Sequence, residues 1–288
     1  MERNLAVGLL YKLNVSITRY IMKLSHVLFV FLLFPSAVYA EYVFTAPPRE
    51  TAEKGEYTYA PIAEYLTKVT GEKFTYNYPG SWKNYTDSMK QHKYDMVFDG
   101  PHFVSWRVKN IEHTVIAKLP QLHIWRLVVL KENSSQLINL SDLVGKKICA
   151  PKSPNFGTLT MLSHFSNPDE QPIHIITKGW RNGYDGVLSQ KCHAAVMPKT
   201  NHNTYDPDNV VTTALHTHLP YPNQAFTIGP NISNGLSGRI QQALIADEGQ
   251  YSMAKLRRRY SKGSPVVSAE DEEYEDISLV LKRANGFN

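Results

Sequence analysis

The residues best placed to do chemistry follow a short apolar run that ends at Pro151. The turn after it supplies two hydroxyls, an amide and a ring at short spacing: Ser153, Asn155, Phe156 and Thr158. A helix is predicted from about residue 158, and the first N–H groups of a helix lack partners and carry its positive dipole end. Such a corner can hold a small anion or polar ligand. The alternative is local capping, which Ser, Asn and Thr also favour.

Further candidates lie at or just after predicted strand ends. Asp99 offers a carboxylate for an ammonium group or a ligand hydroxyl, but Asp also caps helices. His102 could face the same ligand, one helical turn before Trp106. Arg181 offers a planar fork for a carboxylate, sulfonate or phosphate, and Trp180 offers a stacking surface. The alternatives are core packing for Trp106 and an ordinary surface position for Arg181.

Metal binding and catalysis have weaker support. His216 and His218 share one face if they lie on a strand, but two imidazoles are an incomplete ligand set. We therefore predict no metal and no cofactor. The sequence contains no G-x-S-x-G elbow, no H-E-x-x-H helix and no phosphate loop. It favours binding over catalysis, and we predict that the protein is not an enzyme.

Two runs of alternating strands and helices must position these residues. The first run has strands at 42–46, 74–78, 94–98, 114–117 and 123–130 and helices at 60–69, 82–92 and 99–106. The second has strands at 147–150, 174–176, 193–197, 210–215 and 225–228 and helices from 158 and at 184–189. Final helices are predicted near 236–246, 251–260 and 274–284. Such alternation is typical of open sheets with parallel strands, which bind ligands at the carboxyl ends of the strands.

We therefore predict an α/β protein with two lobes, each an open, mostly parallel sheet flanked by helices. Two hinge strands, near 122–129 and 219–227, join the lobes and absorb their motion. The predicted domains are 41–122 (first part of lobe 1), 123–222 (lobe 2) and 223–288 (the return to lobe 1 and the C-terminal helices). Ligands favour the cleft between such domains.

Residues 1–40 are predicted to be an N-terminal extension followed by a secretory signal peptide. A charged start, an apolar run at 27–34 and a small-residue site ending at Ala40 support this interpretation. Eight apolar residues are too few to span a bilayer. We expect translation to start at Met22 and the mature protein to begin near Glu41. A membrane anchor with a longer extension is the alternative.

The charge of the mature chain excludes a nucleic-acid signature. The whole chain has 31 basic and 26 acidic residues, of which residues 1–40 hold four and one. The remaining 27 basic and 25 acidic residues leave a net charge of only +2. The two cysteines, Cys149 and Cys192, form a disulfide if their strands are neighbours in an exported protein. Two buried free thiols are the alternative.

Four segments, in order, resemble the periplasmic substrate-binding proteins of phosphonate/phosphite-type ABC transporters, a branch of the two-lobed type II binding proteins. They are YDMVFDGP at 94–101, LSDLVGKKI at 140–148, Gly179 before Trp180, and SPVVSAEDEEYEDI at 264–277. Together they extend through nearly all of the mature chain.

The resemblance implies a two-lobed periplasmic-binding-protein-like fold (a Venus flytrap) and an exported solute-binding protein. Such a protein would capture a small anionic ligand, phosphonate-like, phosphite-like or another oxyanion, for an ABC permease. We expect a monomer in the periplasm that binds no nucleic acid. The alternatives are a ligand-sensing partner of a membrane receptor kinase and a metal-capture protein.

The chain departs from the family at the ligand contacts. Where the family has a Ser-Thr-Ser-Gly type loop, this chain has Ser153-Pro-Asn-Phe-Gly157. Gly157 is retained, but the run of hydroxyls is lost and Pro154 has no N–H to donate. The phosphonate-contacting His of the family corresponds to Trp180 here. The resemblance therefore predicts where the cleft lies but not phosphonate specificity.

Overall fold

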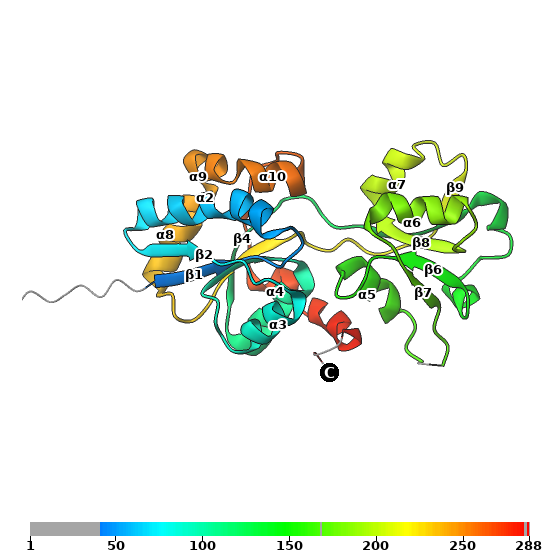
Figure 1. Cartoon of the computed structure of the whole chain (residues 1–288), viewed down its shortest axis with the longest axis horizontal. Coiled ribbons are helices and arrows are strands. Elements are labelled where there is room, and N and C mark those ends of the chain that lie inside the picture. Colours follow the sequence, from blue (N-terminus) through cyan, green and yellow to red (C-terminus); the bar gives the residue numbers. More distant parts are fainter. Residues whose placement is uncertain (1–40, 168, 285–286, 288) are drawn as a thin grey trace, which may run out of the picture. The chain divides into compact units, whose positions relative to one another are not determined.

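The described strands form two mixed sheets flanked by helices, and two chain segments cross between the sheets (Figure 1). The structure is a computed structural model that describes residues 41–167, 169–284 and 287. The predicted signal peptide and the predicted start at Met22 lie outside these residues. Within the described ranges, none of the helices combines the length and the apolar character that a membrane span requires.

We call the first sheet with its helices lobe 1. Its strands are β1 (Glu41–Thr45), β2 (Lys73–Tyr76), β3 (Met96–Asp99), β4 (Thr114–Lys118), β10 (Ala225–Ile228) and β11 (Val267–Ser268). Its helices are α2 (Ala52–Thr70), α3 (Trp82–Lys90), α4 (Pro101–Ile111), α8 (Asn234–Ile245), α9 (Asp247–Ser252) and α10 (Ala254–Ser261). The strand order is β11-β4-β10-β3-β1-β2. The inner strands β3 and β10 are buried at every residue, which explains their mainly apolar sequences, while the edge strand β2 alternates.

We call the second sheet with its helices lobe 2. Its strands are β5 (Trp125–Leu130), β6 (Lys147–Ala150), β7 (Ile173–Ile176), β8 (Ala194–Pro198) and β9 (Thr212–Thr217). Its helices are α5 (Phe156–Ser163), α6 (Gly179–Leu188) and α7 (Lys199–Tyr205), with short 3-10 helices η1 (Lys131–Asn133) and η2 (Leu140–Leu143). The strand order is β7-β6-β8-β5-β9.

Segments 119–124 and 218–224 connect the lobes. They touch at His123 and Tyr221, whose backbone groups exchange hydrogen bonds of 2.8 and 2.9 Å. The predicted domain boundaries, after residues 122 and 222, fall inside these segments. Residues from Glu41 onward nevertheless form one compact unit, so the division into separate domains stays a prediction.

Both sheets are mixed because the crossing strands run against their neighbours. β1 is parallel to β2 and β3, and β6 is parallel to β7 and β8. β10, which returns from lobe 2, is antiparallel to β3 and β4, and β5, which enters from lobe 1, is antiparallel to β8 and β9. The predicted two-lobed α/β class is confirmed. The strands are parallel in β2-β1-β3 and in β7-β6-β8, whereas the edge strand β11 pairs with β4 antiparallel.

Some elements differ from their predicted bounds. α2 begins well before residue 60, because the Thr51 side chain accepts a hydrogen bond from the Lys54 N–H and caps the helix there. Gly55 and Pro61 lie inside this helix and obscure its start in the sequence. The sequence pattern also misses α7 and β11.

The predicted C-terminal helices are shorter in the structure. The predicted helix at 251–260 is the pair α9 and α10, which meet at Met253. The predicted helix at 274–284 is two 3-10 helices, η3 (Asp271–Tyr274) and η4 (Ile277–Arg283). Asp276, between them, has the left-handed φ of 56°, which interrupts helical geometry.

The C-terminal segment packs on both lobes. The Ser278 N–H donates to Ser105 Oγ of α4 at 2.9 Å, and Arg283 Nη2 donates to the carbonyls of Phe165 (2.6 Å) and Ser166 (3.1 Å), just after α5. Leu281 belongs to a buried apolar cluster that draws side chains from both lobes. η4 is therefore a third connection between the lobes.

The two cysteines are bonded to each other. Cys149 lies in β6, and Cys192 lies directly before the neighbouring strand β8, with 5.7 Å between the Cα atoms. Both are buried. Gly186 of α6 lies against the bridge, where an added Cβ would be 2.7 Å from Cys149 Sγ. The question left open by the sequence is thus answered in favour of the disulfide.

We predict that Cys149→Ala combined with Cys192→Ala lowers the free energy of unfolding by about 2–4 kcal/mol. The bridge closes a loop of sequence separation 43 and so limits the unfolded chain. Urea denaturation with and without reductant checks this expectation. The double variant should be insensitive to reductant, and equal stability of the oxidised and reduced parent protein would contradict the prediction.

Candidate functional site

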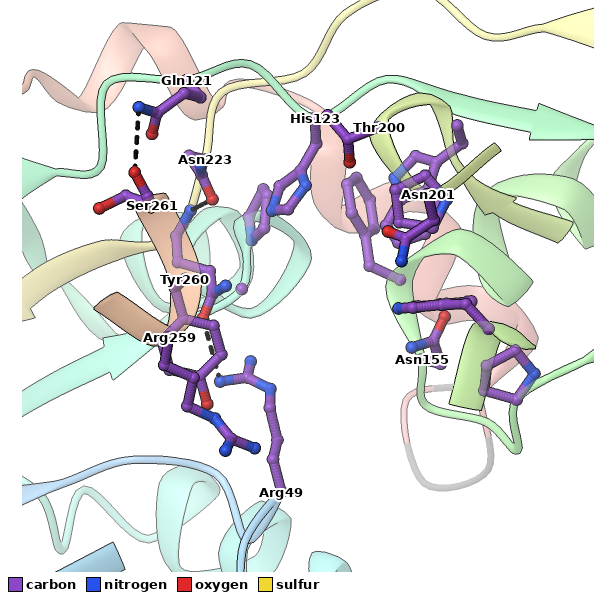
Figure 2. A pocket seen from close by; sticks show the side chains of 18 of the residues that line it. Arg49, Gln121, His123, Asn155, Thr200, Asn201, Asn223, Arg259, Tyr260 and Ser261 are labelled. Atoms are coloured by element: carbon purple, nitrogen blue, oxygen red, sulfur yellow. Dashed lines mark hydrogen bonds between the residues drawn. The ribbon is translucent and has the colours of Figure 1, made fainter. Parts of the chain in front are cut away.

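A cleft of about 700 Å³ is lined by residues of both lobes and of the crossing segments. Figure 2 shows Arg49, Arg259 and Tyr260 on one side of it and Asn155, Thr200 and Asn201 on the other, with His123 between them. The carboxyl end of β3 leads into the lobe 1 side, and the carboxyl end of β6 leads into the lobe 2 side. This is the position that ligands favour in open α/β sheets.

Arg49 is anchored in the lobe 1 wall. It follows β1, and its guanidinium donates to Gln224 Oε1 at 3.2 Å and to Asp99 Oδ1 at 3.5 Å. Burial by itself would lower the pKa of Arg49, but the neighbouring Tyr260 and Asp99 raise it above its usual range. The side chain is 23% exposed and carries a permanent positive charge into the cleft.

Arg259 and Tyr260 come from α10 and share one buried acid. Arg259 Nε lies 2.7 Å from Glu50 Oε1, and the Tyr260 hydroxyl donates to the same oxygen. The Tyr260 hydroxyl is also 3.3 Å from that of Tyr59. Burial raises the pKa of Tyr260, although Arg49 opposes the shift. The phenol therefore stays neutral and can donate a hydrogen bond.

The cleft carries a clear excess of positive charge. Among the described residues, its lining includes the basic side chains Arg49, Lys152, Arg259 and Lys262 and no Asp or Glu. Amide and hydroxyl side chains fill much of the remainder: Gln121, Asn155, Thr200, Asn201, Asn223, Gln224, Ser261 and Ser264. A concave surface with charge of one sign concentrates ions of the opposite sign. The site can bind an anion and surround it with hydrogen-bond donors.

Asp99, a predicted ligand contact, is not among the described residues that line the cleft. Its carboxylate is fully buried and accepts from the Gly100 N–H at 2.7 Å and from the Tyr85 hydroxyl. Arg107 is also fully buried, and its Nη2 lies 3.5 Å from Asp99 Oδ2. Burial raises the pKa of Asp99, and Arg107 and Arg49 oppose the shift. The structure thus gives Asp99 a role in positioning Arg49.

Of the site residues predicted in the turn before α5, some line the cleft and others only stabilise the turn. Asn155 lines the cleft, and its Oδ1 also caps the Thr158 N–H at 3.2 Å. Thr158 is buried, with its hydroxyl bonded to the Pro151 carbonyl at 2.8 Å. Neither Thr158 nor Ser153 is among the described lining residues. Capping therefore accounts for Thr158.

His102 and Phe156 meet across the lobes. His102 Nε2 lies 3.1 Å from the Pro154 carbonyl, which can only accept, so this nitrogen carries the proton. The His102 and Phe156 rings are stacked with centroids 5.0 Å apart. Burial, and then the charge of Arg49, lower the pKa of His102 from 6.5 to about 3. Both residues line the cleft, and His102 stays neutral near pH 7.

Trp180 and Arg181 are consecutive residues in the first turn of α6, and only Trp180 reaches the cleft. Trp180 lines the cleft, and its ring packs against that of Trp125 with centroids 5.4 Å apart. Arg181 is exposed; its Nε pairs with Asp185 Oδ1 at 2.9 Å, and its guanidinium lies over the Tyr205 ring. Arg181 is not among the described residues that line the cleft.

Sequence reasoning misses the residues that most define the site. Arg49 and Arg259 lie 210 residues apart and meet only through folding, so no local motif marks them. Trp82, His123 and Trp125 also line the cleft. Arg49 follows a predicted strand and Arg259 lies in a predicted helix, and neither position by itself marks a cleft.

The histidines considered for metal binding gain a neighbour in the structure. The ring centroid of His164 lies 4.8 Å from that of His216 and 5.3 Å from that of His218. His218 already bonds the Leu219 carbonyl and the Tyr221 hydroxyl. Across the described ranges, no group of three or more His, Cys, Asp or Glu side chains is arranged to hold a metal ion.

Comparison with known proteins gives one family and several similar structures. A family model described as "ABC transporter, phosphonate, periplasmic substrate-binding protein" matches residues 44–274. A Xanthomonas citri protein solved with ATP is 8% identical, with a TM-score of 0.65 and coverage of 84% of this chain and 97% of that chain. No curated protein matches the chain.

Two similar structures come from phosphonate-binding proteins. PhnD1 from Prochlorococcus marinus, in complex with methylphosphonate, is 12% identical, with a TM-score of 0.59 and coverage of 85% of this chain and 98% of that chain. A binding protein component of an ABC phosphonate transporter from Pseudomonas aeruginosa is 11% identical, with a TM-score of 0.54 and coverage of 82% and 83%. At such identities these structures show likeness of fold alone.

We predict that Asp99→Asn lowers the free energy of unfolding by about 3–5 kcal/mol, because the buried Arg107 loses its counter-charge. Chemical denaturation measures the loss. The matched control is Asp87→Asn, at an exposed pair with Lys83, which should cost less than about 1 kcal/mol. Equal losses in the two variants would contradict the buried-charge argument.

We predict that the free energy of unfolding decreases as pH falls from 6.5 towards 4. In the unfolded chain His102 accepts a proton near pH 6.5, whereas in the folded protein its pKa is about 3. The contribution of neutral His102 to the free energy of unfolding is therefore complete above pH 6.5 and is lost as the pH falls towards 3. His102→Gln should reduce the loss between pH 7 and 4.5 by about 2 kcal/mol.

Denaturation at several pH values measures this slope. If His102→Gln leaves the pH dependence of the unfolding free energy unchanged, protonation of His102 is not its cause.

Proposed function

Because the chain belongs to the family of periplasmic substrate-binding proteins of phosphonate ABC transporters, we propose that it captures a small anionic ligand between its lobes for delivery to an ABC permease. The family resemblance predicted from the sequence is confirmed. Members of this family are solute-binding transport proteins rather than enzymes. In line with this, we propose an exported, monomeric binding protein without catalytic activity, secreted by means of the signal peptide predicted in residues 1–40.

The charge of the cleft carries the proposal. Its described lining has four basic side chains and no carboxylate, and Arg49 is held in place by Asp99 and Gln224. A guanidinium that is fixed before the ligand arrives loses little entropy on binding. Phosphonate, phosphite and other oxyanions present the oxygen atoms that such a fork recognises.

The ligands of the similar structures support an oxyanion. Methylphosphonate, bound by PhnD1, and ATP, bound by the Xanthomonas citri protein, both carry oxygen atoms on phosphorus. The turn before α5 has lost the hydroxyl run that holds phosphonate in the family, so the basic residues of the lobe 1 wall are the stronger candidates for the anion. We propose Arg49 and Arg259 as anion contacts, with Asn155, His102, Phe156 and Trp180 completing the site.

The proposed mechanism is closure of the lobes on the ligand. The ligand would contact residues of lobe 1 and lobe 2 at once, and only the closed state would offer both sets of contacts. The crossing segments at 119–124 and 218–224 would absorb the motion. The closed, liganded protein would then be the form that the permease recognises.

We predict that Arg49→Gln weakens binding of methylphosphonate, phosphite or phosphate by roughly 10- to 100-fold, since a hydrogen bond to a charged group is lost. Isothermal titration calorimetry of the mature protein measures the affinities. Arg239→Gln is the matched control, because Arg239 is an exposed arginine of the same lobe outside the cleft lining. It should bind as the parent protein does.

Two results would overturn the proposed function. One is a correctly folded parent protein that binds none of these anions. The other is an equal loss of affinity in Arg49→Gln and Arg239→Gln, which would place anion binding outside the cleft.

A further inference from the structure

We propose that the preferred ligand carries a flat, π-rich group beside its oxyanion and no cationic group. The oxyanion would bind the cationic wall (Arg49, Arg259 and Lys262), and the flat group would pack on the aromatic wall (Trp125, Phe156 and Trp180). This inference rests on the proposed function of the same cleft. It names an aromatic oxyanion, such as an aryl phosphonate, as the class of ligand.

The lobe 2 turn has little left to offer an anion. The N–H and hydroxyl of Thr158 are already bonded to Asn155 and Pro151. Pro154 has no N–H, and the Trp125 ring lies directly on Gly157, where an added Cβ would be 2.4 Å from the ring. Side chains within the protein therefore occupy much of the helix N-terminus that could otherwise hold an oxyanion.

On the cleft, lobe 2 instead has aromatic side chains. Trp125 is the first residue of β5, and its ring packs against two others. The ring centroids are 6.0 Å apart for Phe156 and 5.4 Å apart for Trp180. His123 also stacks on Trp125, with ring centroids 5.7 Å apart. Trp125 and Phe156 are each 6% exposed and thus fixed by packing, whereas Trp180 is only partly buried at the cleft. A partly exposed indole backed by fixed rings is a surface on which a flat group can stack.

The positive charge is concentrated on lobe 1. Arg49 and Arg259 are fixed there by Asp99, Gln224 and Glu50. Lys152, on the lobe 2 turn, is exposed. An oxyanion on lobe 1 leaves the rest of the ligand facing the rings of lobe 2.

The carboxylates near the cleft are already engaged, so a cationic group would find no partner. Glu50 contacts Arg259 and Tyr260, and Asp99 contacts Arg107 and Arg49. Burying an ammonium group beside these arginines, with no carboxylate left to pair with it, is unfavourable. The size of the cleft, about 700 Å³, also falls in the range that accepts ligands much larger than a bare oxyanion.

Calorimetric titration with two phosphonates that share the anionic group tests the proposal. We expect phenylphosphonate to bind the mature protein about tenfold or more tightly than methylphosphonate, from stacking and apolar burial. In Trp180→Ala this advantage should be lost, so that phenylphosphonate and methylphosphonate bind that variant with affinities within about twofold of each other. Tyr251→Ala, which removes an 84% exposed ring outside the cleft lining, should preserve the advantage.

A second pair of ligands tests the exclusion of cations. 2-Aminoethylphosphonate should bind about tenfold more weakly than propylphosphonate, which has a similar length and no ammonium group. In addition, Lys152→Gln should weaken phenylphosphonate binding far less than Arg49→Gln does.

The outcomes separate the two proposals. Equal binding of phenylphosphonate and methylphosphonate, or an advantage that survives in Trp180→Ala, would overturn the inference and leave oxyanion capture intact. Tighter binding of the aminated ligand would do the same. Failure of every phosphonate to bind would overturn the proposed function together with the inference.

Discussion

The carboxylate of Asp99 is the point on which lobe 1 depends. It stands at the end of β3 and contacts Tyr85 of α3, the first N–H of the loop into α4, Arg107 of α4, and Arg49 after β1. A buried charge of this kind is tolerated only when it is paired and hydrogen-bonded, and these four partners meet that requirement. Because one of the partners lines the cleft, the stability of the lobe and the position of its anion contact have a common origin.

The fold could be predicted because its signals are local. Apolar runs, turns and helix caps mark most strands and helices, and four short motifs in order identify the family. The failures have physical reasons: Pro61 lies inside α2, and Asp276 interrupts helical geometry with a left-handed residue. β11 has only two residues, too few to leave a pattern in the sequence.

The site could be predicted only in part, because its chemistry is not local. His102, Asn155, Phe156 and Trp180 lie on the cleft, and each follows a recognisable strand end or turn. Arg49 follows the predicted strand at 42–46 and Arg259 lies in a predicted helix, but their side chains are positioned by Asp99 and Glu50, contacts that only the folded chain creates. Thr158 shows the opposite problem, because a residue type suited to ligands serves equally well to cap a helix. Whether the lining residues contact ligand stays a prediction.

The C-terminal segment has a consequence for how the lobes can move. Two flexible strands alone would let one lobe swing and twist about the other in many directions. η4 adds a third tether, since it is bonded to Ser105 in lobe 1 and, through Arg283, to the end of α5 in lobe 2. A third attachment removes rotations that two connecting segments alone would leave free. If the lobes close on a ligand as proposed, this tether would limit the directions in which they can rotate.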